Sequence, residues 1–250
     1  MDRLSLSHGW LDRLLPEGIP YPSATVISGP GGSGKPLIGL AIARDWLRAG
    51  GSIVFMPLEH SNLAFIAKSF EKLYDLNVED YAGKTAYIEF DPEIGGLEKT
   101  GDGALKANLV KPEVWDKIIG EANELVEESP IGIMFFGSAL NLLLFSPTYG
   151  DKVLEKLVSI IKEHGKNSYL FTVSTSAYRE KIRRLEQASE NLMFTRMEKP
   201  MELYLRIDRM VGVRFLEEEV KVPIPREMLN EIKATADKTR KRAIPRISRI

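Results

Sequence analysis

The sequence predicts an α/β fold with a mostly parallel central sheet, flanked by helices and antiparallel at one edge. Short apolar segments alternate along the chain with segments of helical character, which is the pattern of repeated strand–helix–strand units. Residues 131–136 (IGIMFF) form a near-continuous apolar run, as expected of a strand buried on both faces of a parallel sheet. Residues 24–43 read as a strand, a glycine-rich turn and an apolar helix.

The expected elements of the first half follow from apolar runs separated by glycine and proline. In order, they are a helix over 10–15, a strand over 24–28, a helix from 37 to about 48, a strand over 52–56, a helix over 62–74 and a strand over 85–90.

The second half begins with residues 91–111, which are rich in glycine, lack apolar periodicity and are expected to form a mobile loop. The expected elements after it are a helix from 112 to about 128, a strand over 131–136, a helix over 151–164, a strand over 168–174, a helix over 178–188, paired strands over 192–196 and 201–210, and a C-terminal helix with a basic tail over 225–250.

Bulk composition sets the class of protein. The chain has 250 residues, of which 44% are hydrophobic and 28% charged, with a net charge of -1. We expect a single globular domain over 1–250 with no overall field to attract nucleic acid or membrane. Cysteine is absent, which excludes disulfides and thiolate chemistry. No signal pattern or long apolar run is present, so we expect a cytoplasmic protein without a membrane partner.

The glycine-rich turn matches a phosphate-binding loop. Gly29, Gly34 and Lys35 fit the pattern G-x-x-x-x-G-K-[ST] in every fixed position but the last. Backbone N–H groups of such a loop form a concave nest for phosphate, and the following helix adds the positive end of its dipole. The predicted nucleotide-binding residues are Gly29, Gly31, Gly32, Ser33, Gly34, Lys35 and Pro36.

Pro36 occupies the position of the Ser or Thr whose hydroxyl binds Mg²⁺. Proline offers no side-chain oxygen and no backbone N–H. It also biases the preceding residue, Lys35, towards extended angles, away from the helical region. Proline is compatible with the first turn of a helix, so we expect the fold to persist with a weakened grip on a Mg–nucleotide.

The order of motifs resembles the RecA superfamily and, within it, the archaeal and bacterial KaiC-like proteins. The resemblance covers roughly residues 5–215 and rests on Gly9-Trp10-Leu11-Asp12, on Glu17-Gly18-Ile19-Pro20, on the phosphate loop and on Leu58-Glu59-His60 after the second strand. It implies a RecA-like P-loop fold, ATP or ADP as ligand, and a ring or filament of identical subunits.

The resemblance also identifies positions where this chain departs from the family. The family has an Asp that holds the Mg²⁺ shell where this chain has Gly137, and a second glutamate where it has His60. Glu59 keeps the position of a glutamate that polarises the attacking water. Arg209 keeps the first charge of a segment that reaches the neighbouring subunit's nucleotide. Ser174 and Thr175 end a strand where the family senses the γ-phosphate.

Each candidate residue also has a simpler structural interpretation. Glu59 is a solvated or capping carboxylate if no Mg²⁺ is bound, His60 a surface histidine, and Arg209 a surface charge. The basic tail over 238–249 is either a nucleic-acid contact or a solvated helix end. The apolar segment 139–145 is expected to be core.

The sequence therefore predicts a degenerate ATPase: a nucleotide-binding fold with no protein ligand for a metal, weak binding of ATP or ADP, little or no hydrolysis, and a regulatory or assembly role as a homo-oligomer. Two alternatives stay open. One is an active ATPase linked to DNA or signalling that uses a rearranged Mg²⁺ shell, and the other is a scaffold that binds nucleic acid or protein.

Overall fold

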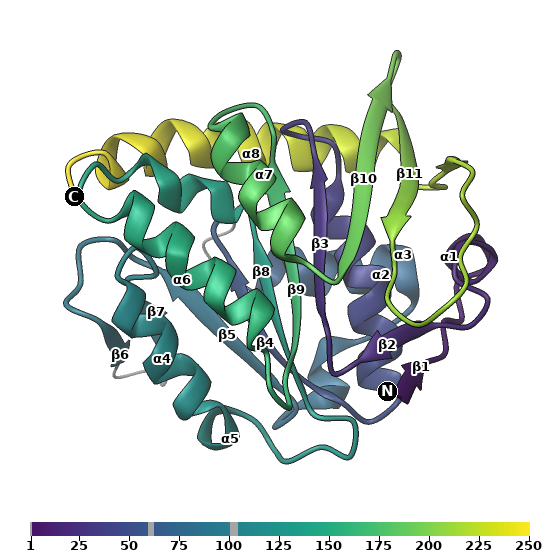
Figure 1. Cartoon of the computed structure of the whole chain (residues 1–250), viewed down its shortest axis with the longest axis horizontal. Helices are drawn as coiled ribbons and strands as arrows, with labels where there is room; N and C mark the ends of the chain where they lie inside the picture. The colour runs from purple at the N-terminus through teal and green to yellow at the C-terminus, as the bar shows by residue number, and fades with distance from the viewer. Residues whose placement is uncertain (1, 60–62, 101–104) are drawn as a thin grey trace.

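A computed structural model of the protein describes residues 2–59, 63–100 and 105–250. Its main feature is a sheet with the strand order β12-β11-β10-β3-β9-β8-β4-β5-β7-β6 (Figure 1). A separate antiparallel pair, β1 and β2, precedes it. The strands are β1 (Asp2–Leu4), β2 (Ile19–Tyr21), β3 (Ala24–Gly29), β4 (Ser52–Pro57), β5 (Thr85–Phe90), β6 (Leu97–Lys99), β7 (Leu105–Ala107), β8 (Ile133–Ser138), β9 (Ser168–Ser174), β10 (Asn191–Glu198), β11 (Glu202–Arg209) and β12 (Val220–Lys221).

The strands from β10 to β7 run parallel to one another. Antiparallel strands close both edges, β11 and β12 at one side and β6 at the other. The predicted α/β class is confirmed, with antiparallel pairing at two edges where we expected one. Because parallel strands end at the same edge, the loops after β3, β4, β8 and β9 lie together there.

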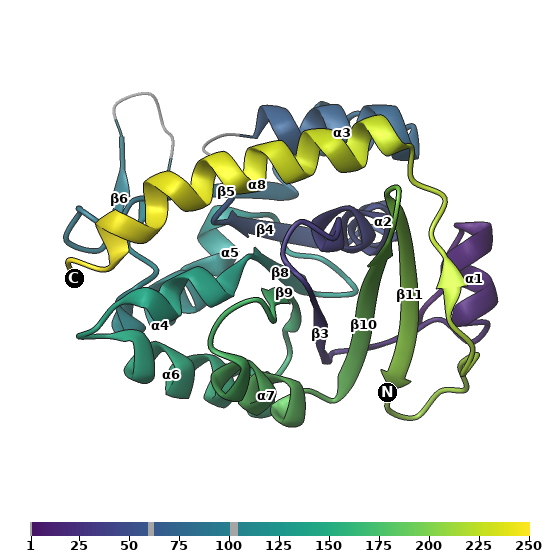
Figure 2. The same ribbon diagram turned by 90° about the horizontal axis from the view of Figure 1, so that it is seen from above.

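Helices cover both faces of the sheet, and one helix lies across the carboxyl ends of its parallel strands (Figures 1 and 2). The helices are α1 (Gly9–Leu14), α2 (Lys35–Arg48), α3 (Ala64–Tyr74), α4 (Pro112–Gly120), α5 (Ala122–Leu125), α6 (Gly150–Lys162), α7 (Arg179–Ala188) and α8 (Arg226–Ile247), with 3₁₀ turns η1 (Val78–Tyr81) and η2 (Leu140–Phe145). Seen from above, α8 runs across the carboxyl ends of the parallel strands (Figure 2).

Alternate residues of the central strands supply two apolar clusters, as the two-residue period of a strand requires. On one face, Phe55 and Phe136 pack with α1, α2 and α3. On the other face, Phe135 and Phe171 pack with α4, α6 and α7. The segment 139–145 was predicted to be core. Its residues from Ala139 to Leu144 are buried, and those from Leu140 onward form η2.

The structure differs from two expectations about irregular and helical segments. Residues 91–111, expected to form a mobile loop, contain the short strands β6 and β7, and residues 101–104 of this segment lie outside the described residues. Asn108, directly after β7, donates hydrogen bonds to the carbonyls of Pro92 and Ile94, which precede β6. The helix expected to run from 112 to about 128 ends at Gly120, and a separate short turn, α5, follows. Glycine stabilises helices poorly, and Val126 has returned to an extended conformation.

Most other boundaries lie within a few residues of the prediction. The hairpin over β10 and β11 is confirmed, and the last helix begins directly after Pro225. The predicted start of the helix at residue 62 lies outside the described residues. In the described part of the chain, every helix is too short or too polar to serve as a membrane span.

Candidate functional site

The loop between β3 and α2 has the shape of a phosphate cradle. Gly32 and Gly34 both have φ of +71°, in the left-handed region that glycine adopts without strain. Gly34 is the N-cap of α2, so the helix points its positive end into the loop. One of the loop's N–H groups, that of Gly31, donates to Ser176 Oγ at 2.9 Å.

Lys35 lies inside this loop with only 5% of its surface exposed. Its ammonium donates to Gly29 O at 3.1 Å, Pro30 O at 2.6 Å and Ser33 Oγ at 3.1 Å. An ammonium has three N–H donors, so the loop itself satisfies all of them. Burial lowers the pKa of Lys35 to about 8, opposed by the charge of Glu59 and assisted by that of Arg240.

The helix α2 begins at Lys35 and carries Pro36 in its first turn. The expectation that Pro36 would push Lys35 out of the helical region is therefore wrong. Steric pressure from the proline ring is a bias rather than a prohibition, and the three hydrogen bonds of the ammonium hold Lys35 in place.

Neither of the two positions at which the family resemblance places a metal ligand, Pro36 and Gly137, carries a side-chain oxygen. Pro36 lines the cavity over the loop, together with Lys35 and Glu59. It also lines a small neighbouring pocket with Leu40, Phe55, Pro57, Phe65, Ile66, Phe136 and Ser138. A Cβ at Gly137 would lie 3.0 Å from both methyl groups of Leu140 and 3.1 Å from Phe171 Cδ1. Hard cations require oxygen ligands, so the residues at these two positions do not fit a magnesium shell. No group of three or more His, Asp or Glu side chains that could hold a metal is found among the described residues.

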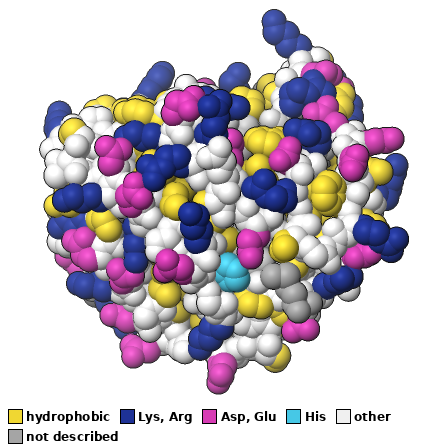
Figure 3. All heavy atoms as spheres, viewed as in Figure 1, with side chains coloured by type: hydrophobic (Ala, Val, Ile, Leu, Met, Phe, Trp, Pro, Cys, Tyr) yellow, Lys and Arg dark blue, Asp and Glu magenta, His cyan; other side chains and the backbone are white. Residues whose placement is uncertain are grey.

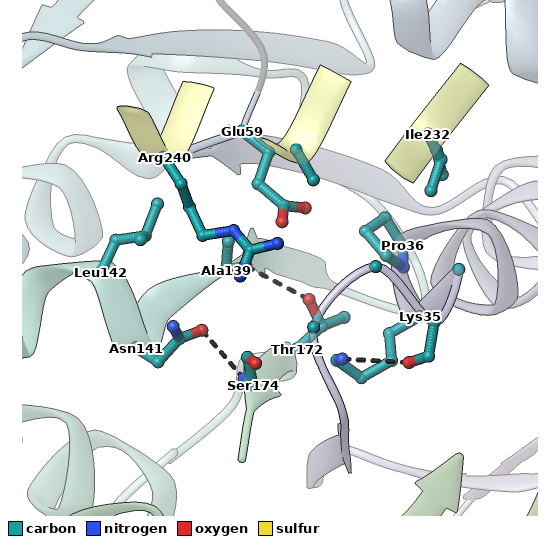
Figure 4. A pocket seen from close by; sticks show the side chains of 15 residues that line it. Lys35, Pro36, Glu59, Ala139, Asn141, Leu142, Thr172, Ser174, Ile232 and Arg240 are labelled. Atoms are coloured by element: carbon teal, nitrogen blue, oxygen red, sulfur yellow. Dashed lines mark hydrogen bonds between the residues drawn. The ribbon is translucent and has the colours of Figure 1, made fainter. Parts of the chain in front are cut away.

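Glu59 follows β4 and points into the space above the loop (Figure 4). Burial raises the pKa of Glu59, while the positive charges of Lys35 and Arg240 oppose that rise and Asp237 adds to it. The carboxylate thus lies in the electrostatic field of two cations. Its neighbour His60 lies outside the described residues.

The ends of β8 and β9 complete the floor of the site through polar contacts between backbone and side chain. Asn141 Oδ1 accepts a hydrogen bond from Ser174 N at 2.9 Å, and Thr172 Oγ1 accepts one from Ala139 N at 3.2 Å (Figure 4). Thr175 N donates to Gly29 O at 2.9 Å. Ser174 and Thr175 are therefore brought beside the loop, as the sequence predicted for this sheet edge.

Arg209 is not at this edge. It ends β11 and pairs with Leu192, near the start of β10, at the opposite end of the parallel strands. Its guanidinium donates to Ser189 O at 3.2 and 2.8 Å and to Glu186 O at 2.8 Å, which are carbonyls at the C-terminal end of α7. Arg209 therefore contacts its own chain here, and a role across a subunit boundary stays a prediction.

Sequence reasoning missed the residues that cover the loop from above. The cavity over the loop is lined on this side by Ile232, Ala236 and Arg240, all from α8. We expected residues 225–250 to be a helix with a basic tail that is either solvated or in contact with nucleic acid. A stripe of small and apolar residues at helical spacing, 229, 232, 236 and 243, was the available signal.

No model of a protein family matches the sequence. The archaeal flagellar ATP-binding protein FlaH of Methanocaldococcus jannaschii is 30% identical over 171 residues, which span 64% of this chain and 73% of that protein. The chain belongs to the FlaH family.

Two solved structures, one of them of a FlaH protein, have a fold similar to that of this chain. The flagellar accessory protein FlaH of M. jannaschii superposes with a TM-score of 0.63 at 16% identity, covering 89% of this chain and 94% of that one. A KaiC-like protein of Pyrococcus horikoshii OT3 gives 0.62 at 15% identity, with 90% and 94% covered. The predicted KaiC-like, RecA-type fold is confirmed.

Proposed function

We propose that this FlaH-family chain is an accessory protein of the archaeal flagellar type that binds ATP or ADP weakly and has lost most or all hydrolysis. Its relative in M. jannaschii is named as an ATP-binding protein, and the phosphate loop with Lys35 keeps the shape needed to bind a phosphate group. A regulatory or assembly role within a homo-oligomer is the function that remains for such a site.

The observation that carries this proposal is the lack of a side-chain oxygen at Pro36 and Gly137, the two positions at which the family resemblance places metal ligands. Phosphoryl transfer relies on a metal ion to neutralise charge on the transferring group. Gly137 packs against Leu140 and Phe171, and Pro36 offers no side-chain oxygen to the cavity that it lines together with Lys35 and Glu59, so a metal shell would have to be built from other oxygen atoms. Glu59 is a candidate base for water, and its carboxylate lies in the electrostatic field of Lys35 and Arg240.

Calorimetric titration with ATP and with ADP, each with Mg²⁺ and with EDTA, tests the proposal together with a phosphate-release assay. We expect weak affinity that Mg²⁺ does not increase, and turnover no greater than that of Lys35→Ala. Lys84→Ala, a lysine remote from the loop that donates to Gly50 O, is the matched control. Magnesium-dependent turnover that Lys35→Ala abolishes and Lys84→Ala retains would establish the active-ATPase alternative.

The nucleic-acid alternative has less support from the surface. Basic and acidic side chains are interspersed on the face shown in Figure 3, without a continuous basic patch. Near the end of α8, Arg246 is already paired with Asp91 at 3.1 Å and Glu93 at 2.9 Å. Salt-dependent binding to single- or double-stranded DNA that Lys241→Glu removes would revive this alternative.

A further inference from the structure

Helix α8 turns one side towards the phosphate loop. Along this side the chain places residues three or four apart, which face the same way on a helix. Most of them are apolar or small and buried, and Arg240 is the charged exception. The side is formed by Leu229, Ile232, Ala236, Arg240, Ala243 and Ile247.

Three glycines of the loop are in close contact with this helix. A Cβ at Gly34 would lie 2.8 Å from Leu229 Cδ2, and one at Gly32 would lie 3.1 Å from Lys233 Cγ. A Cβ at Gly31 would lie 2.9 Å from Arg240 Nη1. The concave face that the loop would offer to a phosphate is therefore covered by side chains of α8.

The remaining space is small. The cavity between the loop and α8 leaves about 20 Å³ for the centres of water-sized molecules, enough for one or two waters. Arg240 extends into it from α8, towards the space between Glu59 and Asn141 (Figure 4). A diphosphate or triphosphate chain does not fit this space while the side chains of α8, Arg240 among them, lie where they do.

Contacts outside the cavity hold α8 in this position. Thr239 Oγ1 donates to Glu59 O at 2.7 Å, and Glu231 forms an ion pair with Lys68 on α3. Leu229 and Ile232 join one apolar cluster, while Ala243 and Ile247 join the other. Nearer the end of the helix, Arg246 pairs with Asp91 and Glu93. These ion pairs are mostly at the surface, where they contribute little, so the helix is held mainly by its apolar side.

We propose that α8 is a built-in competitor of nucleotide: the seated helix and a bound nucleotide exclude each other at the phosphate loop. This inference rests on the proposed function, since it concerns the same site. Binding then requires the fraction of molecules in which α8 has left its seat, and the apparent dissociation constant is the intrinsic one divided by that fraction. The weak affinity for nucleotide then has two causes: the competition by α8 and the lack of metal ligands at Pro36 and Gly137.

Two alanines on α8 provide a matched test in the full-length chain. Ala236 is buried and faces the cavity, whereas Ala234 is exposed on the same helix. Ala236→Trp cannot be accommodated in the cavity and should lift α8 from the loop; Ala234→Trp adds the same side chain to the solvent side. Calorimetry with ADP in EDTA should show at least roughly tenfold tighter binding for Ala236→Trp than for the parent, and no change for Ala234→Trp.

Hydrogen exchange supplies a second readout, because it reports whether α8 is seated whatever the affinity. Amides of 229–243 should exchange faster in Ala236→Trp than in the parent, and faster in the parent with saturating ADP than without it. Equal ADP affinity in the parent and an Ala236→Trp chain whose α8 exchanges faster would overturn the competition while leaving nucleotide binding intact. Unchanged α8 exchange in the ADP-saturated parent would do the same.

Failure of the proposed function has a different signature. If α8 exchanges fast in Ala236→Trp and the opened chain still binds no ADP, then the loop is not a nucleotide site and both ideas fall. Arg240→Ala distinguishes a side chain that blocks nucleotide from one that binds it. Tighter ADP binding by this variant supports competition. Binding weakened roughly tenfold would mean that Arg240 contacts the phosphate while α8 is seated, and it would overturn the exclusion of nucleotide by α8.

Discussion

Introducing an acidic residue at Gly137 should destabilise the protein without creating a metal site. The Cβ of any replacement lies 3.0–3.1 Å from Leu140 and Phe171, so these neighbours must shift, and overpacking of this kind costs about 1–3 kcal/mol. Gly137→Asp adds a carboxylate among hydrocarbon. A rise of about three units in its pKa on burial corresponds to about 4 kcal/mol at neutral pH. The total, about 5–7 kcal/mol, is a large share of the stability of a typical domain.

Three variants separate these terms by urea unfolding. Gly137→Ala measures the steric part, Gly137→Asn adds a polar group, and Gly137→Asp adds charge. The new carboxyl has a folded-state pKa above its unfolded value of about 3.9, so its penalty is absent below about pH 4 and grows as pH rises to the folded pKa. The Asp variant should match the Asn variant at about pH 4 and fall below it by about 4 kcal/mol at about pH 7.5.

The reasoning would be refuted if Gly137→Asp were as stable as Gly137→Asn at about pH 7.5, or if millimolar Mg²⁺ stabilised the Asp variant selectively. Either result would mean that the carboxylate finds solvent or a cation at this position. Combining the change with Pro36→Thr sharpens the comparison, because a hydroxyl and a carboxylate together would supply two oxygen ligands.

Two further predictions concern charged groups. The pKa of Lys35 is about 8, so its ammonium loses its proton above that pH. ADP affinity should then fall towards tenfold per pH unit. Constant affinity from about pH 7 to 9.5 in calorimetric titrations would contradict a phosphate contact by Lys35. Arg209→Ala removes the hydrogen bonds to Glu186 O and Ser189 O and should lower unfolding free energy by about 1–2 kcal/mol, measured by urea denaturation. Arg183→Ala, whose partner is the exposed Glu180, should change it by less than about 0.5 kcal/mol, and equal effects would exclude a structural role for Arg209.

The central strands and their helices were predictable because their apolar runs are long and bounded by glycine or proline. The strand ending at Gly29 and the strand over 168–174 were placed within a residue. The short strands at the rim were not, since β6 and β7 hold three residues each and depend on Asn108 bonding to distant carbonyls. Three-residue strands carry too little periodicity to be distinguished from loop.

The same distinction between local and distant contacts applies to the site. The phosphate loop from Gly29 to Pro36 is continuous in sequence and could be identified directly, and the parallel arrangement of the strands places Ser174 beside it. Its cover is not local: Arg240 lies far along the chain from Gly31 and reaches it only through the packing of α8. The helix itself was predictable from the sequence, but the surface on which it lies was not.

Position along the chain has a consequence for how the protein is made. Helix α8 follows every strand of the sheet in sequence, and during synthesis N-terminal segments emerge from the ribosome before C-terminal ones. A chain in which β3, β9 and β10 have paired before α8 emerges holds the loop without the residues of α8 above it. If seated α8 and bound nucleotide exclude each other as proposed, the loop is open to nucleotide during synthesis and becomes covered only when α8 has packed.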